Sequence, residues 1–291
     1  MPRGVPKAGF RKTKNNIAKI VPQQVDVEVI TNETDEEIDA RISERFEILA
    51  DLVDGAVSGD IRAMIVSGPA GLGKSFTVDR ALSDWDPNEL NHTVISGYVK
   101  ATGLFKTLYQ YRNKGQVIVF DDADSIFFDD TSLNLLKAVC DTSDRRRVSY
   151  LSEGSLIDED TAERLPKTFD FEGTIIFITN YDFDAMIDRG HKLAPHLNAM
   201  LSRAHYIDLT MKSKRDYLIR IKQVIELGLF NKTDSAIQLT AQEQADVIDF
   251  IESNVNKLRE LSLRMAIKLG ALRKTKPAKW KNVAKVTCCR I

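Results

Sequence analysis

The sequence has few cysteines and no long hydrophobic run, and each of these absences excludes a class of protein. Its three cysteines, Cys140 and the adjacent Cys288 and Cys289, have a spacing that suits neither a disulfide framework nor a zinc site. No apolar run approaches the roughly 20 residues that a transmembrane helix requires. The N-terminus also lacks the apolar stretch of a signal peptide. We therefore expect a protein of a reducing, cytoplasmic compartment without membrane association.

Acidic residues are missing from both ends of the chain. Residues 1–20 contain six Lys or Arg and residues 273–290 contain seven, with no Asp or Glu in either segment. The rest of the chain holds 28 of the 41 basic residues and all 42 acidic ones, a formal charge of about −14. Basic segments on an acidic body can contact nucleic acid locally, and they can equally be solvated tails. We expect an irregular basic tail over residues 1–33 and a second basic tail over residues 273–291.

A glycine-rich loop near residue 70 carries the most specific motif of the chain. Its residues are Gly68, Pro69, Ala70, Gly71, Leu72, Gly73, Lys74 and Ser75. An apolar stretch over residues 63–66 precedes the loop, and a helical spacing of apolar residues follows from Phe76. The pattern G-x-x-x-x-G-K-[ST] between a strand and a helix is typical of a loop that binds nucleotide phosphates. Glycines let backbone N–H groups approach the phosphate oxygens, and the helix N-terminus favours their negative charge.

This loop predicts a site for ATP and Mg²⁺. Lys74 is expected to reach the β- and γ-phosphates, and the Ser75 hydroxyl is expected to ligate Mg²⁺. The other loop residues and Phe76 are expected to contact the nucleotide. The alternative is a glycine-rich turn with an accidental lysine, and the flanking strand and helix argue against it.

Polar residues end two further apolar strands. Asp121 and Asp122 follow residues 117–120, and Asn180 follows residues 174–179. Continuous apolar runs of this kind mark strands of a parallel sheet, and ligands bind at the carboxyl edge of such a sheet. A nucleotide site needs one carboxylate near Mg²⁺ and another polar group that orients or deprotonates the attacking water. The alternative is that all three are ordinary turn residues.

The alternation of strands and helices predicts the fold class. Thr34 and Glu37 form a capping-box pattern at the start of a first helix. Apolar strands then alternate with helical segments, which predicts an α/β nucleotide-binding domain over residues 34–210, with a parallel sheet and helices on both faces. Only helical spacing follows, which predicts a small all-helical lid domain over residues 211–272.

These motifs, in this order, resemble those of AAA+ ATPases over most of the chain. The resemblance implies that Asp121 is the Walker B ligand of Mg²⁺ and that Asp122 activates the attacking water. It also implies that Asn180 is the residue called sensor 1, which contacts the water or the γ-phosphate.

The resemblance further implies two functional arginines and a ring oligomer. Arg203 occupies the position of the arginine finger, which reaches the γ-phosphate bound by the neighbouring subunit of a ring, a hexamer in this family. Arg264 resembles sensor 2, which couples the lid to the nucleotide. Arg189 and the run of residues 145–147 are alternatives for the finger, and each of these arginines can instead be a solvated surface charge.

One departure from the family pattern concerns the second Walker B acid. AAA+ proteins usually have Glu there, and Asp122 is one methylene shorter, so hydrolysis is expected to be slow or geometrically shifted. Asp124 is a reserve candidate for this role. The segments 169–180 and 261–264 are also similar to AAA+ proteins of bacteriophages, which would place the protein in the cytoplasm of a host cell.

Two loops are candidates for contact with a substrate. Tyr98 and Lys100 follow the predicted strand over residues 93–96, where ring ATPases of this family have an aromatic pore loop. Tyr98 could grip a peptide or stack on a base, or simply pack at the strand end. An insertion before sensor 1, between Asp141 and Thr168, contains Arg145, Arg146 and Arg147. It could be a hairpin that contacts DNA, which we expect, or a second pore loop, although a charge run is more often a solvated face.

The sequence therefore predicts a ring-forming, Mg²⁺-dependent ATPase that remodels or translocates DNA or a protein–DNA complex. A protein-remodelling motor or chaperone is one alternative, with Tyr98 pulling on polypeptide. A low-turnover ATP switch such as a helicase loader is another, and the Asp122 departure favours it.

Overall fold

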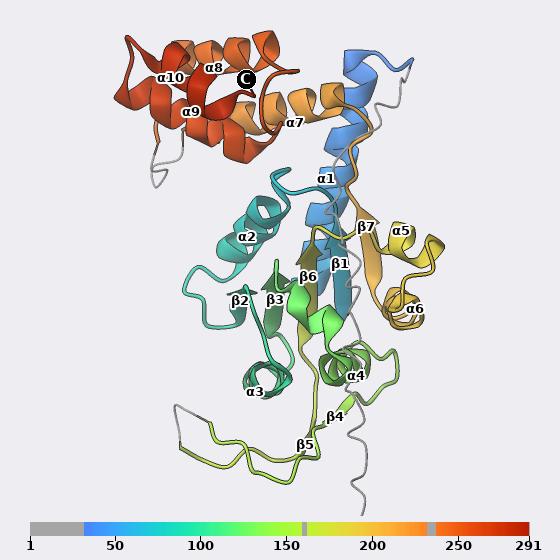
Figure 1. Ribbon diagram of the computed structural model, residues 1–291. Coiled ribbons are helices and arrows are strands. Elements are labelled where there is room, and N and C mark those ends of the chain that lie inside the picture. Colours follow the sequence, from blue (N-terminus) through green and yellow to red (C-terminus); the bar gives the residue numbers. More distant parts are fainter. Residues whose placement is uncertain (1–31, 159–161, 232–236, 291) are drawn as a thin grey trace, which may run out of the picture.

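A five-stranded parallel sheet forms the centre of the computed structural model, which describes residues 32–158, 162–231 and 237–290. Its strand order is β2-β3-β6-β1-β7 (Figure 1). The strands are β1 (Ala63–Ser67), β2 (His92–Ser96), β3 (Val117–Asp121), β6 (Thr174–Thr179) and β7 (His205–Asp208). The predicted fold class is confirmed. Nearly all of the tail predicted over residues 1–33 lies outside the described residues.

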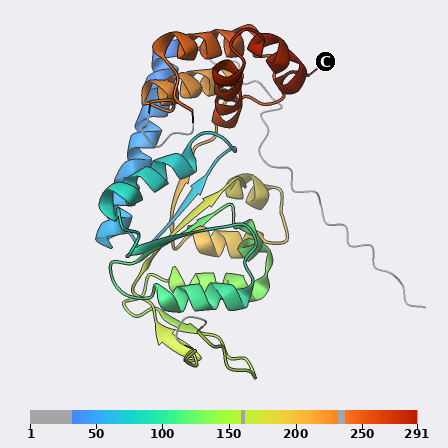
Figure 2. The ribbon, with the colours of Figure 1, turned by 90° about the vertical axis from the view of Figure 1, so that its left-hand side faces the viewer.

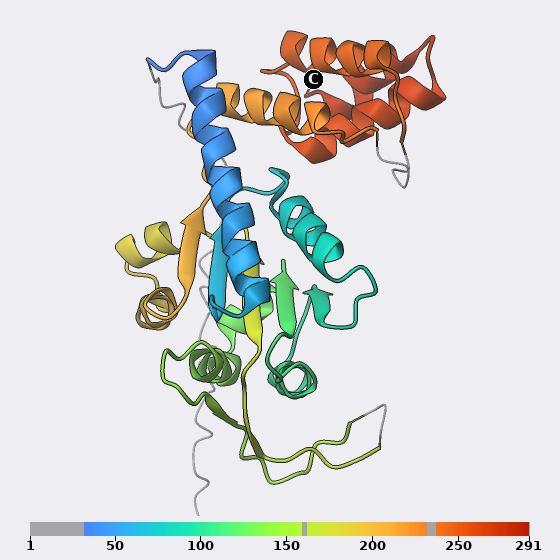
Figure 3. The ribbon, with the colours of Figure 1, turned by 180° about the vertical axis from the view of Figure 1, so that it is seen from behind.

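Helices cover both faces of this sheet (Figure 2). Because side chains alternate along a strand, Val66 of β1 packs against the helices of one face and Ile65 against those of the other. The first face carries α1 and α2, and α1 crosses it in Figure 3. The helices of the sheet domain are α1 (Asp35–Ser58), α2 (Lys74–Trp85), α3 (Ala101–Gln110), η1 (Asp124–Phe128), α4 (Asp130–Val139), α5 (Phe183–Asp188) and α6 (Ala194–Leu201).

The first helix begins where the sequence predicts. The Thr34 hydroxyl accepts a hydrogen bond from the Glu37 N–H (3.2 Å), and the Glu37 carboxylate accepts one from the Thr34 N–H (2.8 Å). This capping box satisfies two backbone donors that the start of a helix leaves unpaired. None of the helices in the described part of the chain has the length and apolar character needed to cross a membrane.

The insertion before β6 forms a hairpin that extends from the sheet domain (Figure 1). Its strands β4 (Arg147–Ser149) and β5 (Thr168–Asp170) pair antiparallel. The hairpin is held against α3 because Phe169 packs on Phe105 and Tyr109, with ring centroids 5.1 and 5.3 Å apart. The hairpin therefore lies beside the helix that directly follows the Tyr98 loop.

In the described residues, four helices form the lid domain, at the end of the sheet domain opposite the hairpin (Figure 1). They are α7 (Lys214–Glu226), α8 (Ala241–Ser253), α9 (Leu263–Thr275) and α10 (Trp280–Cys288). Their buried side chains form an apolar core separate from the two cores of the sheet domain.

The prediction of a separate C-terminal tail over residues 273–291 is wrong, because this segment completes the lid. Trp280, Ala284 and Cys288 are spaced four residues apart and are 4%, 0% and 5% exposed. This spacing places them on one face of α10, which packs against the lid core. The basic residues between them point to solvent. The number of charges in this segment therefore gives no indication of its apolar face.

We predict that Trp280→Ala destabilises the lid strongly. Trp280 packs on Phe250 with ring centroids 5.2 Å apart, and truncating a buried Trp to Ala typically costs about 3–5 kcal/mol of unfolding free energy. Thermal or denaturant unfolding measures this loss. Val286→Ala on the same helix, where the side chain is 69% exposed, is the control and should change stability little. Equal effects of the two variants would contradict the packing of α10.

Candidate nucleotide-binding site

The predicted phosphate-binding loop connects β1 to α2. Gly71 and Gly73 have φ angles of +77° and +92°, in the left-handed region that favours glycine. The lid also requires glycine at these two positions. A Cβ on Gly71 would lie 2.6 Å from the Ser262 Cβ, and one on Gly73 would lie 3.1 Å from the Leu263 Cδ1. Contact with the start of α9 therefore constrains the loop, in addition to any requirement of a ligand.

Lys74 is buried at the centre of the site. Only 5% of the residue is exposed, and its Nζ donates to the carbonyls of Gly68 (2.5 Å) and Pro69 (2.9 Å) and to Asn180 Oδ1 (2.9 Å). Burial lowers the pKa of Lys74 to about 8, against the opposing effect of the Asp122 and Asp121 carboxylates. The ammonium is therefore poised to gain from a phosphate, which favours its charged form.

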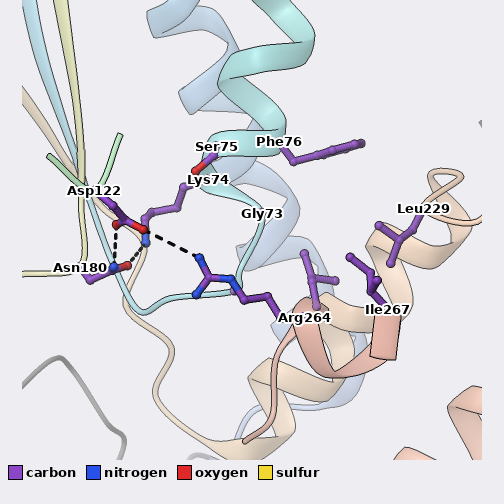
Figure 4. Close-up of a pocket in the computed structure, with 11 residues that line it drawn as sticks. Gly73, Lys74, Ser75, Phe76, Asp122, Asn180, Leu229, Arg264 and Ile267 are labelled. Carbon is purple, nitrogen blue, oxygen red and sulfur yellow. Dashed lines mark hydrogen bonds and ion pairs between the residues drawn. The ribbon is translucent and has the colours of Figure 1, made fainter. Parts of the chain in front are cut away.

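Asp122, Asn180 and Arg264 meet over Lys74 (Figure 4). Asn180 Nδ2 donates to Asp122 Oδ1 (2.7 Å), and Arg264 Nη2 lies 3.8 Å from Asp122 Oδ2. Asp122 has a φ of +52°, which is uncommon for a residue other than glycine. These residues come from the ends of β3 and β6 and from the lid, so the structure brings together side chains that are far apart in sequence.

Ser75 and Asp121 form a second pair beside Lys74. The Ser75 hydroxyl donates to Asp121 Oδ1 (2.9 Å). Burial raises the pKa of Asp121, and the hydrogen bond from Ser75 opposes this rise. A hydroxyl and a carboxylate are oxygen ligands of the kind that Mg²⁺ prefers, and this ion commonly takes its remaining ligands from water and substrate phosphates. The predicted metal residues therefore fit the ion.

Asp124 occupies a different place from Asp122. Its Oδ1 accepts a hydrogen bond from the Thr179 hydroxyl (2.6 Å). Burial raises the pKa of Asp124 to about 6, although this hydrogen bond opposes the shift. Asp122, by contrast, lines the cavity itself. The geometry therefore favours Asp122 over Asp124 as the group that meets a ligand.

The cavity has an apolar end that the sequence analysis found only in part. It has a volume of about 190 Å³ and runs from the polar residues above to the side chains of Phe76, Leu229 and Ile267 (Figure 4). Phe76 was predicted to contact the nucleotide, whereas Leu229 and Ile267 come from the lid and carry no motif. A polar end beside an apolar end suits a molecule with charged phosphates and a flat base.

Arg203 lies away from this cavity. It precedes β7, which is parallel to β1, so it lies at the amino edge of the sheet while the loop leaves the carboxyl edge. Its Nη1 donates to the Ala199 carbonyl (2.7 Å). Arg189, the alternative, is exposed at the end of α5. In this structure neither arginine reaches the cavity of its own chain.

The substrate-loop residues have unequal surroundings. Tyr98 is 78% exposed, and Lys100 is also exposed. Arg145 forms a two-pronged ion pair with Asp170 (2.9 and 2.8 Å) at the surface, and Arg147 is exposed on β4.

The prediction that Arg146 contacts a substrate needs correction. The residue is 5% exposed, and its guanidinium donates to the carbonyls of Val139 (2.9 Å) and Gly173 (2.8 Å). It also lies over the Phe171 ring, 5.1 Å from the centroid. Arg146 therefore fixes the base of the hairpin and is not available to DNA.

Comparison with known proteins identifies a relative from a phage. The chain is 36% identical over 254 residues to an uncharacterized 36.7 kDa protein in the nrdC-mobD intergenic region of Enterobacteria phage T4. The alignment covers 87% of this chain and 76% of that protein. The chain belongs to the same family as this phage protein. No protein-family model matches the sequence.

The order of the elements in this chain agrees with the resemblance to AAA+ ATPases described above. The loop between β1 and α2, the acids at the end of β3, Asn180 after β6 and the helical lid follow in the order of an AAA+ ATPase. The expected similarity to a bacteriophage protein is confirmed by the phage T4 relative.

Solved structures of low sequence identity are also similar. The Holliday junction branch migration motor RuvB of Thermotoga maritima is 16% identical with a TM-score of 0.42, and the match covers 88% of this chain and 65% of that one. Domain III of the Thermotoga maritima replication initiation protein DnaA is 12% identical with a TM-score of 0.48, covering 86% and 92%. This chain spans less than two thirds of the RuvB chain. At these values the likeness carries no conclusion about activity or assembly.

We predict that ATP binding takes up a proton at alkaline pH through Lys74. The pKa of Lys74 is about 8 in the free protein, and phosphates raise it, so above pH 8 binding must protonate the amine. Calorimetry in buffers of different ionisation enthalpy should find uptake rising towards about one proton between pH 7.5 and 9.5.

Two variants control this measurement. Lys74→Arg keeps its charge throughout this pH range, so the uptake should disappear while binding persists. Lys74→Ala should abolish tight binding. If Lys74→Arg still takes up a proton when it binds ATP, the proton goes to another group.

Proposed function

We propose that the protein is a Mg²⁺-dependent ATP hydrolase that works in a ring, a hexamer, and remodels or translocates DNA or a protein–DNA complex. One observation carries the proposal. Lys74, Asp122 and Asn180, which follow three adjacent strands, and Arg264, from the lid, converge on a single cavity with an apolar end. We place this activity in the cytoplasm, that of the host cell if the source is a phage.

The residues of the cavity suit the steps of phosphoryl transfer to water. Lys74 and the N–H groups of the loop would bind the phosphates. Ser75 and Asp121 would hold Mg²⁺, which would neutralise charge on the phosphates. Asp122 accepts a proton from the attacking water, and Asn180 orients that water through its amide. The hydrogen bond between Asn180 and Asp122 already aligns these two groups.

The lid is suited to report the state of the nucleotide. Arg264 lies beside Asp122 with 59% of its side chain exposed, so it can turn towards a γ-phosphate. The Leu263 N–H donates to the Gly71 carbonyl (2.8 Å), and this bond ties the start of the same helix to the loop. Loss or movement of the γ-phosphate would therefore shift α9 through these two contacts.

Arg203 is the reason for proposing a ring. It cannot reach the cavity of its own chain from the amino edge of the sheet, but a neighbouring chain can bring it to the phosphates. An arginine supplied in this way can accelerate phosphoryl transfer by about 10³–10⁵. The site is then complete only between two subunits.

The Tyr98 loop is connected to the site by a short path. The Val99 N–H donates to the Ser125 hydroxyl (2.9 Å), and Ser125 belongs to η1, which begins at Asp124. A shift of the Walker B segment on hydrolysis would thus move Tyr98 and Lys100. The hairpin that carries the exposed Arg145 and Arg147 packs on α3 through Phe169.

The lid offers a surface for nucleic acid. Five lysines are exposed and form no ion pair with a carboxylate of the described residues, namely Lys274, Lys276, Lys279, Lys281 and Lys285. Since α10 is a packed helix, these charges are held on a folded surface and not on a tail. Fixed basic side chains that replace counterions on phosphates are the main source of nucleic-acid affinity.

A low-turnover switch is the second candidate. The short side chain of Asp122 is engaged by Asn180 and Arg264, and these two contacts compete with an attacking water for the carboxylate. A protein-remodelling motor would instead use the exposed Tyr98 to grip polypeptide. The steady-state rate of ATP hydrolysis and its dependence on DNA distinguish the DNA-remodelling ATPase, the low-turnover switch and the protein-remodelling motor.

We predict multiple ATP turnovers that DNA stimulates, measured together with oligomer size with and without single- and double-stranded DNA. Arg203→Ala should leave ATP binding intact and reduce turnover by at least about 10³. Arg189→Ala is the matched control for the alternative finger. Full activity of Arg203→Ala would reject its role, and a monomer that binds ATP without turnover would favour the switch.

We predict that Lys281→Glu with Lys285→Glu weakens binding to DNA at low salt. Each lost phosphate contact lowers the slope of log affinity against log salt by about 0.9 for duplex DNA. Electrophoretic or fluorescence titrations at several salt concentrations measure this slope. Val286→Glu, at an exposed position of the same helix, is the control: it shows the effect of a substitution in α10 that leaves both lysines in place. An unchanged slope would remove the lid surface from the proposal.

A further inference from the structure

Arg220, in the lid helix α7, is a buried arginine without a carboxylate partner among the described residues. It is 4% exposed, and its Nη1 donates to Gln223 Oε1 (3.2 Å). Its guanidinium carbon lies 3.3 Å from the centroid of the Phe46 ring. Burial lowers the pKa of Arg220 to about 10, and no carboxylate opposes this shift. Buried charges are costly unless they are compensated, and the hydrogen-bond and ring partners of Arg220 within the described part of the chain are all neutral groups.

The guanidinium lies against the phosphate-binding loop. Its Nε donates to the Leu72 carbonyl (3.2 Å). Its Nη2 lies 3.6 Å from the position that a Cβ on Gly73 would take, and Gly73 directly precedes Lys74. Phe46, from α1, stacks on the plane of the guanidinium and fixes its orientation. A positive charge is thus held next to the loop that is proposed to bind phosphates.

The helix that carries Arg220 is firmly attached to the sheet domain. Gln223 Nε2 donates to Asp39 Oδ1 (2.9 Å) and to Ser43 Oγ (2.9 Å) of α1. Arg41 Nη2 also pairs with Asp216 Oδ2 of α7 (3.0 Å). Arg220 is therefore held in place by α1, and its position does not depend on the orientation of Arg264.

We infer that Arg220 is a positioning residue for the nucleotide phosphates, whose negative charge compensates its buried guanidinium. It supports the loop through the Leu72 carbonyl and adds to the positive potential at the phosphate site. The inference rests on the proposed ATP site and names a residue of it that no motif contains. The effect of Arg220 therefore grows with the number of phosphates on the ligand.

Arg146 provides a matched comparison within the same chain. It is 5% exposed, its pKa is also lowered to about 10 by burial, and it too lies over an aromatic ring. Its hydrogen bonds go to two backbone carbonyls at the base of the hairpin, away from the loop. The two arginines are equally buried and differ in what lies beside them.

The test compares Arg220→Met, Arg220→Lys and Arg146→Met with the wild type. The affinities for AMP, ADP and ATP with Mg²⁺ are measured by calorimetry, and unfolding temperatures are measured without nucleotide. Arg220→Met should weaken ATP binding by about tenfold or more and AMP binding least. Arg220→Lys, which keeps the charge, should retain most of the affinity. Arg146→Met should lower the unfolding temperature and leave the affinities unchanged.

The outcomes separate the inference from the function on which it rests. If Arg220→Met binds AMP and ATP with the wild-type ratio of affinities, Arg220 has only a structural role and the inference is overturned. If Arg220→Met does not fold, Arg220→Gln against Arg220→Lys gives the same comparison of charge at similar size. If the wild type binds none of the three nucleotides, the ATP site itself is wrong, and the role of Arg220 fails with it.

Discussion

The burial of the Lys74 ammonium is the constraint on which the rest of the site depends. A charge this far from water must be compensated, and the structure compensates it with two loop carbonyls and the Asn180 side chain. Asn180 in turn holds Asp122. The loop after β1, the end of β6 and the end of β3 are thereby fixed around one cation, at the edge where parallel strands present their carboxyl ends.

The loop is also where the lid is attached. Leu263 donates to its Gly71 carbonyl and Arg220 to its Leu72 carbonyl, so two lid helices bind consecutive residues of the loop. A ligand that adjusts this backbone changes both contacts together. Because α7 is fixed to α1, the more movable part of this connection is α9, which carries Arg264.

The two ends of the molecule differ in chemistry. The hairpin packs on α3 at the opposite end from the lid (Figure 1), whereas the lid presents exposed lysines in and between α9 and α10 that pair with no carboxylate in the described part of the chain. The hydrogen bond between Val99 and Ser125 links η1, which follows the acids at the end of β3, to the loop that leads into α3. The hydrogen bond between Leu263 and Gly71 links the phosphate-binding loop to α9. The cavity is therefore placed to influence both.

The sequence by itself determined the parallel sheet, the glycine-rich loop, the two acids at the end of β3, Asn180 after β6 and the α1 capping box, because each has a local pattern of glycine, charge or apolar spacing. Only the tertiary structure decided that Arg146 is buried, that α10 belongs to the lid, and that Arg220, Leu229 and Ile267 join the site. These features depend on which surfaces pack together across more than 100 residues in several cases. The local spacing of residues does not predict such contacts, because an arginine or leucine of a solvated helix has the same sequence pattern as one that packs into the site.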